Sequence, residues 1–432
     1  MNEPGHWGND GENSLRWIVA QEGSRRTYTL PLAFERMGVL RLMYADIWCL
    51  HARDWLRKGS GGLRALSTRH HKGIADGKVV SFSAGAILKK AWLHHWGSRL
   101  QRQDLGNFYC EFGRWYATRI KKHLERLELD PLRDCFIGFN TNCLELLGFL
   151  KERQVRCILD QVDPARIEES IIQEEASRWP GWSNGDATFS EGYWNRIKAE
   201  WDLADYVRVS SEWSREALVR QRVSAHKIFV APLAIELPES LPRPIDINTG
   251  VLKVLYLGSL ILRKGVAYLA EAARLLERHN IEFLMAGPVG ISERALKTFP
   301  ANMRLLGRIT RDQLKNVYRQ AHLFVFPTLS DAFGVTQLEA MSQGLPVIAT
   351  PHCARVVTHG HDGLIVPARD GAALAEAIAR LDGDRHFLHE LSANALKTVQ
   401  KYGVPNNGLA IQREVLKMRE KKMKSGHSLR HA

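Results

Sequence analysis

Two carboxylates in one short segment could bind the hydroxyl groups of a sugar. Asp331 lies in a polar loop after an apolar run, and Glu339 follows eight residues later in a stretch with helical spacing. Between them, a glycine allows a ligand to approach the backbone closely, and the first amides of a helix attract an anion. We expect these amides to belong to Gly334, Val335 and Thr336. The pattern favours a nucleotide-sugar site; the alternative is an aspartate in a turn and a glutamate on a helix surface.

Two adjacent cations, Arg263 and Lys264, follow another strand-like run and a short loop. Positive charges are poorly placed at the start of a helix, since that end already carries partial positive charge. A bound diphosphate would remove this repulsion, with the guanidinium as a bidentate donor and the ammonium as a point charge. The loop opens at Gly258, but no further glycines complete a dinucleotide-binding motif. The alternative is a solvated pair of surface cations.

Strand-like and helix-like segments alternate along most of the chain and place both loops at strand ends. Strands are predicted at 16–20, 135–139, 156–159, 206–210, 228–231, 251–257, 281–286, 304–306, 322–326, 346–349 and 364–366. Helices are predicted at 30–37, 266–278, 313–320, 336–342 and 372–381. Such alternation is typical of parallel sheets with helices on both faces.

A cluster of prolines between Pro232 and Pro244 can continue neither a helix nor a central strand, and it predicts a linker. The fold class that follows is α/β, with two doubly wound Rossmann-like domains facing across a cleft. In such folds ligands bind at the carboxyl ends of the strands. The predicted parts are an acceptor-side domain (1–240), the linker (241–250), a nucleotide-sugar-binding domain (251–405), and a C-terminal helix with a basic tail (406–432).

Taken together, these motifs resemble those of GT-B glycosyltransferases of the retaining family 4 type, the glycosyl transferases group 1. That family has the frame E-G-F-G…E-A-M-A-x-G-x-P-V. The same spacing here is filled by Asp331-Ala332-Phe333-Gly334, Glu339-Ala340-Met341, Gly344, Pro346 and Val347. The family's strand, glycine and K-G loop are matched by Gly258 and Lys264-Gly265, and its later N-G-x-x-V-P stretch by Asp362-Gly363-Leu364-Ile365-Val366-Pro367.

The chain departs from the family pattern at several positions. Asp331 replaces the first Glu, and Ser259 stands where the family has an Arg, so that Arg263 is expected to substitute. The family's Gly-Gly-x-x-Glu is replaced by the segment 351–355. In the first half no His is found at the strand end 159–163, and only Gly23 remains of the family's Gly-rich acceptor loop.

The resemblance implies a glycosyltransferase that moves a sugar from a nucleoside-diphosphate sugar to a glycan or lipid-linked acceptor in polysaccharide or glycoconjugate biosynthesis. Asp331 and Glu339 would be the catalytic pair, with Asp331 at the transferred sugar and Glu339 at the ribose. The remaining donor-binding residues would be Gly258, Arg263, Lys264, Gly307, Arg308, Phe333, Gly334, Val335 and Thr336. No metal and no cofactor are expected, since the cations would stabilise the departing diphosphate.

The charge is uneven along the chain. Its net value is +13, and the segment 41–126 holds 17 Lys or Arg against 6 Asp or Glu, interleaved with aromatic residues such as Trp55 and Trp92. Such a surface suits an anionic membrane, although a solvated basic face is the alternative. With no apolar run of about 18 residues and no signal-like N-terminus, we expect a cytoplasmic protein with reduced thiols, peripheral on the inner face of the membrane.

Two other functions fit parts of the pattern. Asp331 and the missing His fit a protein of the same shape that binds a nucleotide sugar without transferring it. The charge alone fits a nucleic-acid-binding protein, but that function leaves the sugar-binding residues without a role, and nucleic acid is not the expected partner.

Overall fold

The computed structural model describes residues 15–50, 56, 66–97, 104–183, 188–246 and 250–428. Three parts of the chain lie outside the described residues: the polar N-terminus, Trp55 with much of the basic segment around it, and the last residues of the basic tail. The chain forms two compact units. The first comprises Met1–Asp160, Phe189–Val207 and Ile411–Ala432, and the second comprises Gln161–Thr188 and Arg208–Ala410.

The predicted domains follow the chain without interruption, whereas the compact units do not. Gln161–Thr188 belongs to the second unit because its helix is tied there by ion pairs, among them Glu175 Oε1 to Arg369 Nε at 2.6 Å. The end of the chain, Ile411–Ala432, belongs to the first unit.

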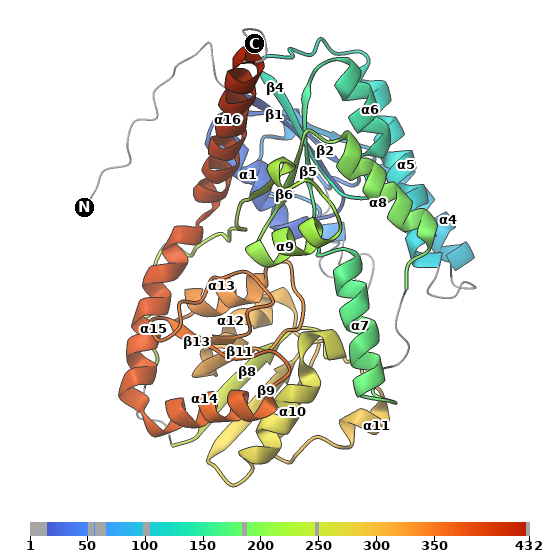
Figure 1. Ribbon diagram of the computed structural model, residues 1–432. Coiled ribbons are helices and arrows are strands. Elements are labelled where there is room, and N and C mark those ends of the chain that lie inside the picture. Colours follow the sequence, from blue (N-terminus) through green and yellow to red (C-terminus); the bar gives the residue numbers. More distant parts are fainter. Residues whose placement is uncertain are drawn as a thin grey trace. The chain divides into compact units, whose positions relative to one another are not determined.

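Among the described residues, seven strands form the first sheet, in the order β3-β2-β1-β4-β5-β6-β7. Figure 1 labels β1, β2, β4, β5 and β6 of this sheet. Its strands are β1 (Arg16–Gln21), β2 (Leu40–Ala45), β3 (Val79–Ser81), β4 (Asp134–Phe139), β5 (Arg156–Asp160), β6 (Tyr206–Val209) and β7 (Ile228–Val230). The helices that the structure describes in this half of the chain are α1 (Thr29–Arg36), α4 (Ser83–Gly97), α5 (Asp104–Leu124), α6 (Leu144–Glu152), α7 (Arg166–Arg178), α8 (Glu191–Leu203) and α9 (Glu212–Arg220).

In the part of the chain that the structure describes, six strands form the second sheet, in the order β10-β9-β8-β11-β12-β13, and their pairings are parallel. Its strands are β8 (Leu252–Leu257), β9 (Ile281–Ala286), β10 (Met303–Gly307), β11 (Leu323–Phe326), β12 (Val347–Ala349) and β13 (Gly363–Ile365). The helices are α10 (Val266–Leu275), α11 (Glu293–Leu296), α12 (Arg311–Arg319), α13 (Val335–Ser342), α14 (Gly371–Gly383), α15 (Arg385–Val399) and α16 (Val404–Ser428).

Both faces of the second sheet are covered by helices. Along β8, Val254 and Tyr256 join a core with residues of α10, α14 and α15, whereas Leu255 and Leu257 join a core with residues of α12 and α13. Successive side chains of a strand point to opposite faces, so a continuous apolar run must be buried on both. The predicted fold class, α/β with doubly wound Rossmann-like domains, is confirmed.

Within the described residues, no helix is both long enough and apolar enough to cross a membrane. All six cysteines lie within the described residues, and each is a free thiol.

Candidate donor site

The candidate site lies where the strand order of the second sheet reverses. Neighbouring strands β8 and β11 pair in parallel, with Phe324 opposite Leu255. The chain leaves β8 toward β9 on one side and leaves β11 toward β12 on the other. Loops at the carboxyl ends of such strands diverge and leave a crevice for a ligand. The two predicted segments, around Arg263 and around Asp331, are these loops.

The two loops approach each other closely at Gly265. This glycine has φ +74° and follows a 3-10 turn, Leu262–Lys264. A Cβ atom added there would lie 1.8 Å from the carbonyl oxygen of Pro327. The backbone N–H of Leu329 also donates to the carbonyl of Arg263 at 2.8 Å. Only a glycine fits this approach, which fixes the cations of the first loop beside the second loop.

Lys264 and Asp331 form an ion pair across the two loops. The ammonium contacts Asp331 Oδ2, while Oδ1 accepts a hydrogen bond from the backbone N–H of Phe333 at 3.0 Å. Burial acts to raise the pKa of Asp331, but the Lys264 charge and its hydrogen bond outweigh burial and lower the pKa. Asp331 is therefore a fixed anion that positions Lys264.

Arg263 is bound on the other side of the same loop. Its Nη1 donates to the carbonyl of Ser330 at 2.6 Å and lies 3.2 Å from Glu168 Oε2 on α7. Among the described residues, nothing bonds to its Nε or Nη2, so these nitrogens are available to a ligand. Glu168 was not among the predicted site residues, and the helix in which it lies was not predicted from the sequence.

Helix α13 begins directly after the second loop. Gly334, its N-cap, has φ +81°, and a Cβ atom there would lie 2.4 Å from the Phe326 ring. The buried side-chain amide of Gln337 donates to the carbonyl of Phe333 at 3.0 Å and so holds this turn. Val335 and Thr336, the first helical residues, are half-buried. Their amides lie in the first turn of a helix, where N–H groups lack intrahelical acceptors.

Glu339, the other carboxylate of the predicted pair, lies within α13 and contacts the neighbouring helix α12. Glu339 Oε2 accepts a hydrogen bond from the hydroxyl of Tyr318 on α12 at 2.9 Å. Burial, with the Glu339 charge, raises the pKa of Tyr318. Within the described residues no hydrogen bond or ion pair joins Glu339 to Lys264 or Asp331. The structure thus brings Arg263, Lys264 and Asp331 together and leaves Glu339 one turn away.

Gly258 directly follows β8 and Gly307 ends β10, and β9 lies between these two strands in the sheet. The N–H of Gly258 donates to Ala286 at 2.9 Å, and the N–H of Gly287 donates to Gly307 at 2.8 Å. Gly307 has φ +70°, and a Cβ atom there would meet nothing within 4 Å. Arg308, which follows it, is exposed. Gly258, Gly307 and Arg308 thus lie at the carboxyl ends of their strands. Between described residues, no hydrogen bond or ion pair joins Arg308 to Lys264 or Asp331.

The segment that replaces the family's Gly-Gly-x-x-Glu lies against the second loop. The carbonyl of His352 accepts from the Asp331 N–H at 3.0 Å, and the ring of His352 stacks on Trp213 with centroids 4.3 Å apart. Burial lowers the pKa of His352, so this ring is neutral at neutral pH. The segment therefore supports Asp331 through its backbone.

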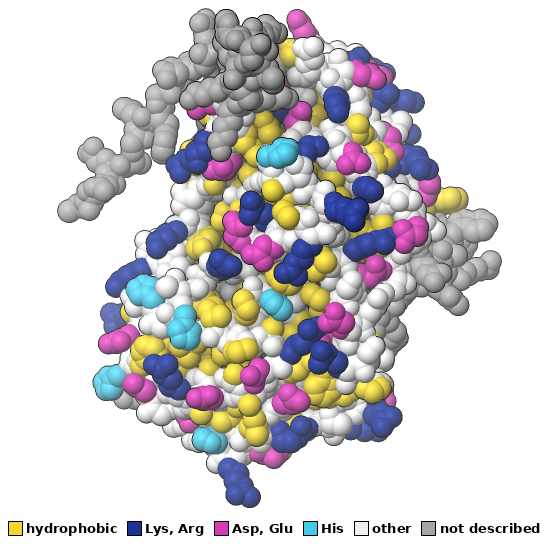
Figure 2. Space-filling model, in the orientation of Figure 1, with side chains coloured by type: hydrophobic (Ala, Val, Ile, Leu, Met, Phe, Trp, Pro, Cys, Tyr) yellow, Lys and Arg dark blue, Asp and Glu magenta, His cyan; other side chains and the backbone are white. Residues whose placement is uncertain are grey.

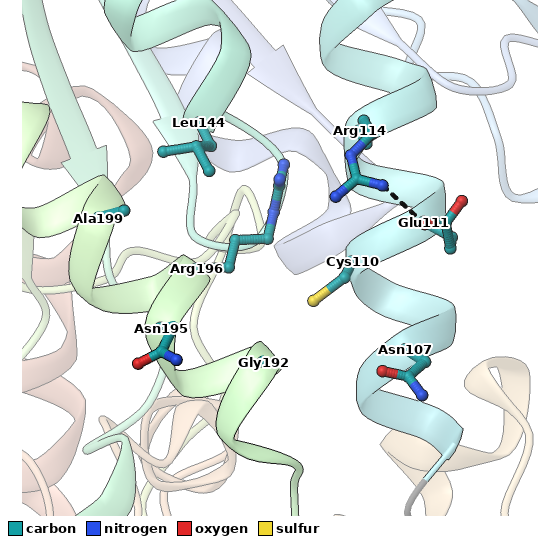
Figure 3. Close-up of a pocket in the computed structure, with 9 residues that line it drawn as sticks. All are labelled: Asn107, Cys110, Glu111, Arg114, Leu144, Gly192, Asn195, Arg196 and Ala199. Carbon is teal, nitrogen blue, oxygen red and sulfur yellow. Dashed lines mark hydrogen bonds and ion pairs between the residues drawn. The ribbon is translucent and has the colours of Figure 1, made fainter.

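The first unit holds a separate pocket of about 610 Å³ between α5 and α8 (Figure 3). Five of its nine lining residues have amide or charged side chains, and the full lining is Asn107, Cys110, Glu111, Arg114, Leu144, Gly192, Asn195, Arg196 and Ala199. Arg196 donates to both carboxylate oxygens of Glu145 at 2.8 Å. The buried Glu200, also on α8, accepts from the backbone N–H groups of Thr141, Cys143 and Leu144, which lie just before and at the start of α6. Burial raises the pKa of Glu200 to about 7 despite these donors.

The part of the chain that holds this candidate site is similar to known proteins. Residues 252–384 match the family model described as Glycosyl transferases group 1. The matched residues lie within the second unit. An uncharacterized glycosyltransferase of Methanocaldococcus jannaschii is 29% identical over 173 residues, which are 38% of this chain and 44% of the relative. The amylovoran biosynthesis glycosyltransferase AmsK of Erwinia amylovora is 30% identical over 190 residues, 40% of this chain and 46% of the relative. The matched parts span less than half of either relative.

Similarity of fold to solved structures extends beyond the residues that the family model matches. Anabaena HepE, crystallised with UDP and glucose, has a TM-score of 0.59 at 13% identity and covers 93% of this chain and 100% of its own. Sucrose-phosphate synthase of Thermosynechococcus elongatus has a TM-score of 0.62 at 16% identity, with coverage of 94% and 100%. At these identities the likeness shows the fold, and the predicted GT-B class is confirmed.

Proposed function

We propose that this chain is a glycosyltransferase that moves a sugar from a nucleoside-diphosphate sugar to a glycan or lipid-linked acceptor. The observation that carries the proposal is the pair of cations, Arg263 and Lys264, held beside the start of α13 at the strand-order reversal. AmsK is named for amylovoran biosynthesis, and HepE was crystallised with UDP-glucose. Both names support the same chemistry.

The diphosphate would accept hydrogen bonds from Nε and Nη2 of Arg263, from the ammonium of Lys264 and from the first amides of α13. Fixed donors of this kind stabilise the charge that develops on a departing diphosphate, which is the main electrostatic task of such a reaction. Asp331 would keep Lys264 in place and face the transferred sugar. Glu339, steadied by Tyr318, would accept the ribose hydroxyls. Retention of configuration and the absence of a metal remain part of the proposal.

The test is sugar transfer by purified protein. UDP-, GDP- and ADP-sugars are incubated with extracts of lipid-linked and free glycans, and released nucleoside diphosphate and labelled product are measured. The proposal predicts turnover with one donor class, lost in Lys264→Ala and kept in Lys297→Ala, an exposed lysine of the same unit. Proton NMR of the product then reports the anomeric configuration.

A second candidate is binding without transfer. Both oxygens of Asp331 already have partners in the protein, Lys264 and the Phe333 amide, which favours a structural over a sugar-binding role. This candidate predicts nucleotide-sugar binding with no turnover above that of Lys264→Ala.

For the acceptor we propose the pocket between α5 and α8. Its amide and guanidinium side chains donate hydrogen bonds, and its volume falls in the range of about 300–1,000 Å³ usual for small-molecule sites. Asn107→Ala with Asn195→Ala should raise the KM for acceptor and leave the KM for donor unchanged. An unchanged acceptor KM would place the acceptor elsewhere.

We also propose that the first unit binds an anionic membrane through α4. Leu88 and Trp92 are 71% and 53% exposed there, and the ammonium of Lys89 lies 4.5 Å from the Trp92 ring centroid. Apolar and cationic side chains on one helix suit an interfacial position. Leu88→Asp with Trp92→Asp should abolish sedimentation with anionic vesicles at low salt, whereas Leu275→Asp, at an exposed leucine of the second unit, should not. Failure of the wild type to sediment would contradict the proposal.

Charge alone gives weaker support to nucleic-acid binding. On the face shown in Figure 2, Lys and Arg are interspersed with Asp and Glu rather than gathered into one basic field. Phosphate-backbone binding draws its affinity from clustered cations. Nucleic acid is therefore not part of the proposal.

A further inference from the structure

Helix α7 places a carboxylate directly on the donor-site arginine. Glu168 Oε2 lies 3.2 Å from Arg263 Nη1 and accepts a hydrogen bond from Ser330 Oγ at 3.0 Å. Its side chain is 19% exposed, as is that of Arg263. Ser330 immediately precedes Asp331, so Glu168 touches both loops of the candidate site.

The position of α7 does not depend on this contact. Two turns further along, Glu175 accepts from Arg369 Nε at 2.6 Å and from the Tyr268 hydroxyl at 2.9 Å. Ile171 packs with Tyr268 and Leu329 in a small apolar cluster. Because these contacts anchor α7 to the second unit, a change at Glu168 should alter the site without displacing the helix.

The charges of the site balance within the protein. Two cations, Arg263 and Lys264, face two carboxylates, Glu168 and Asp331. Asp331 is bound to the helix start and positions Lys264, whereas Glu168 lies on α7 and contacts Arg263 and Ser330. Burial raises the pKa of Glu168 although the Arg263 charge acts to lower it; once Glu168 is ionised, a diphosphate meets one carboxylate beside each of the two cations.

We propose that Glu168 is an internal counter-anion that competes with the donor diphosphate for Arg263 and so weakens diphosphate binding. The inference rests on the proposed function, because it concerns the same site. Weaker binding of the diphosphate would hasten release of the product nucleotide. Glu168 is in this sense an affinity-setting residue of the donor site.

The test compares Glu168→Gln with the wild type by calorimetry at pH 8 and low salt. The amide keeps the shape and can still accept from Arg263 and Ser330, so only the charge is lost. A unit charge about 6 Å from the ligand contributes roughly a three- to hundredfold change in affinity for effective dielectric constants between 80 and 20. We expect UDP to bind at least about threefold more tightly, with a smaller gain at high salt.

The matched control is Glu174→Gln. Glu174 lies on the same helix, is 54% exposed and pairs with Arg369 Nη2 at 2.6 Å, away from the donor site. It should leave the affinity for UDP unchanged. Uridine, which carries no phosphate, should bind equally to the wild type and Glu168→Gln.

Inorganic pyrophosphate separates this inference from the proposed function. If no nucleotide binds any variant but pyrophosphate binds Glu168→Gln more tightly than the wild type, the donor assignment fails and the counter-anion stands. Equal or weaker binding of UDP and pyrophosphate by Glu168→Gln would overturn the inference, and so would an equal gain for uridine.

Discussion

Replacing Gly265 with alanine should destabilise the second unit more than any similar change at the other predicted site glycines. The left-handed φ of +74° costs about 1–2 kcal/mol for a residue with a Cβ atom. The overlap of that Cβ atom with the Pro327 carbonyl, at 1.8 Å, adds about 1–3 kcal/mol as the two loops are forced apart. The expected loss is therefore about 2–5 kcal/mol.

Two other glycines act as controls because they separate the two causes. Gly307→Ala carries the φ cost alone, since nothing lies within 4 Å, and should lose about 1–2 kcal/mol. Gly258→Ala should lose less than about 0.5 kcal/mol, because its nearest neighbour is the Tyr256 hydroxyl at an ordinary 3.6 Å. Scanning calorimetry measures the three losses as midpoint shifts of about 2–4 °C per kcal/mol.

The order of the melting temperatures of the three variants tests whether the two loops approach each other closely at Gly265. Gly265→Ala should melt lowest, and it should also lose nucleotide affinity because Lys264 moves away from Asp331. If Gly265→Ala and Gly307→Ala melt together, the two loops are not in the close approach on which the site depends.

Three further predictions concern single contacts. The free energy of unfolding of the wild type, relative to that of Glu200→Gln, should fall by about 3 kcal/mol as pH rises from about 4.5 to about 7. The reason is that Glu200 keeps its proton in the folded state over this range, whereas the unfolded state has released it. A difference in free energy of unfolding between the two proteins that stays the same at all pH values, measured by urea unfolding, would contradict this prediction. Tyr318→Phe should lower stability by about 1 kcal/mol through loss of the hydrogen bond to Glu339, measured by urea unfolding, and an unchanged midpoint would show that this bond contributes nothing. Asp384→Ala should cost about 1 kcal/mol, because the aspartate caps α15 by accepting from Phe387 N, and amide exchange at the start of that helix should rise if the cap matters.

The second sheet was predictable because its strands are continuous apolar runs that end at glycines or polar loops. The strand predicted at 281–286 is β9 with the same bounds, and the segments at 251–257 and 322–326 each differ from β8 and β11 by one residue. Burial on both faces makes such runs recognisable without knowledge of their partners.

The first sheet was harder to predict because polar residues interrupt its strands. Strand β2, Leu40–Ala45, contains Arg41, whose guanidinium pairs with the buried Asp134 on β4. An arginine within an apolar run indicates the end of a strand when its distant partner is not known from the sequence. Helix α7 was missed for a similar reason, since its glutamates have partners only in the folded unit.

The same contrast holds in the candidate site. Arg263, Lys264 and Asp331 were predicted together, because each lies in a loop directly after a predicted strand. Glu168 was not predicted, because its contact with Arg263 joins residues 95 apart in the sequence. Which carboxylate faces which cation is a property of tertiary packing that local spacing does not encode.

The most direct test of the central claim is nucleotide binding by the wild type, Lys264→Ala and Lys297→Ala, measured as thermal stabilisation by UDP, GDP and ADP. A ligand present at about 100 times its dissociation constant stabilises a protein by about 2.7 kcal/mol. We expect one nucleoside diphosphate to stabilise the wild type and Lys297→Ala by this amount and to leave Lys264→Ala unchanged. Equal stabilisation of all three proteins, or of none, would contradict the assignment of this site.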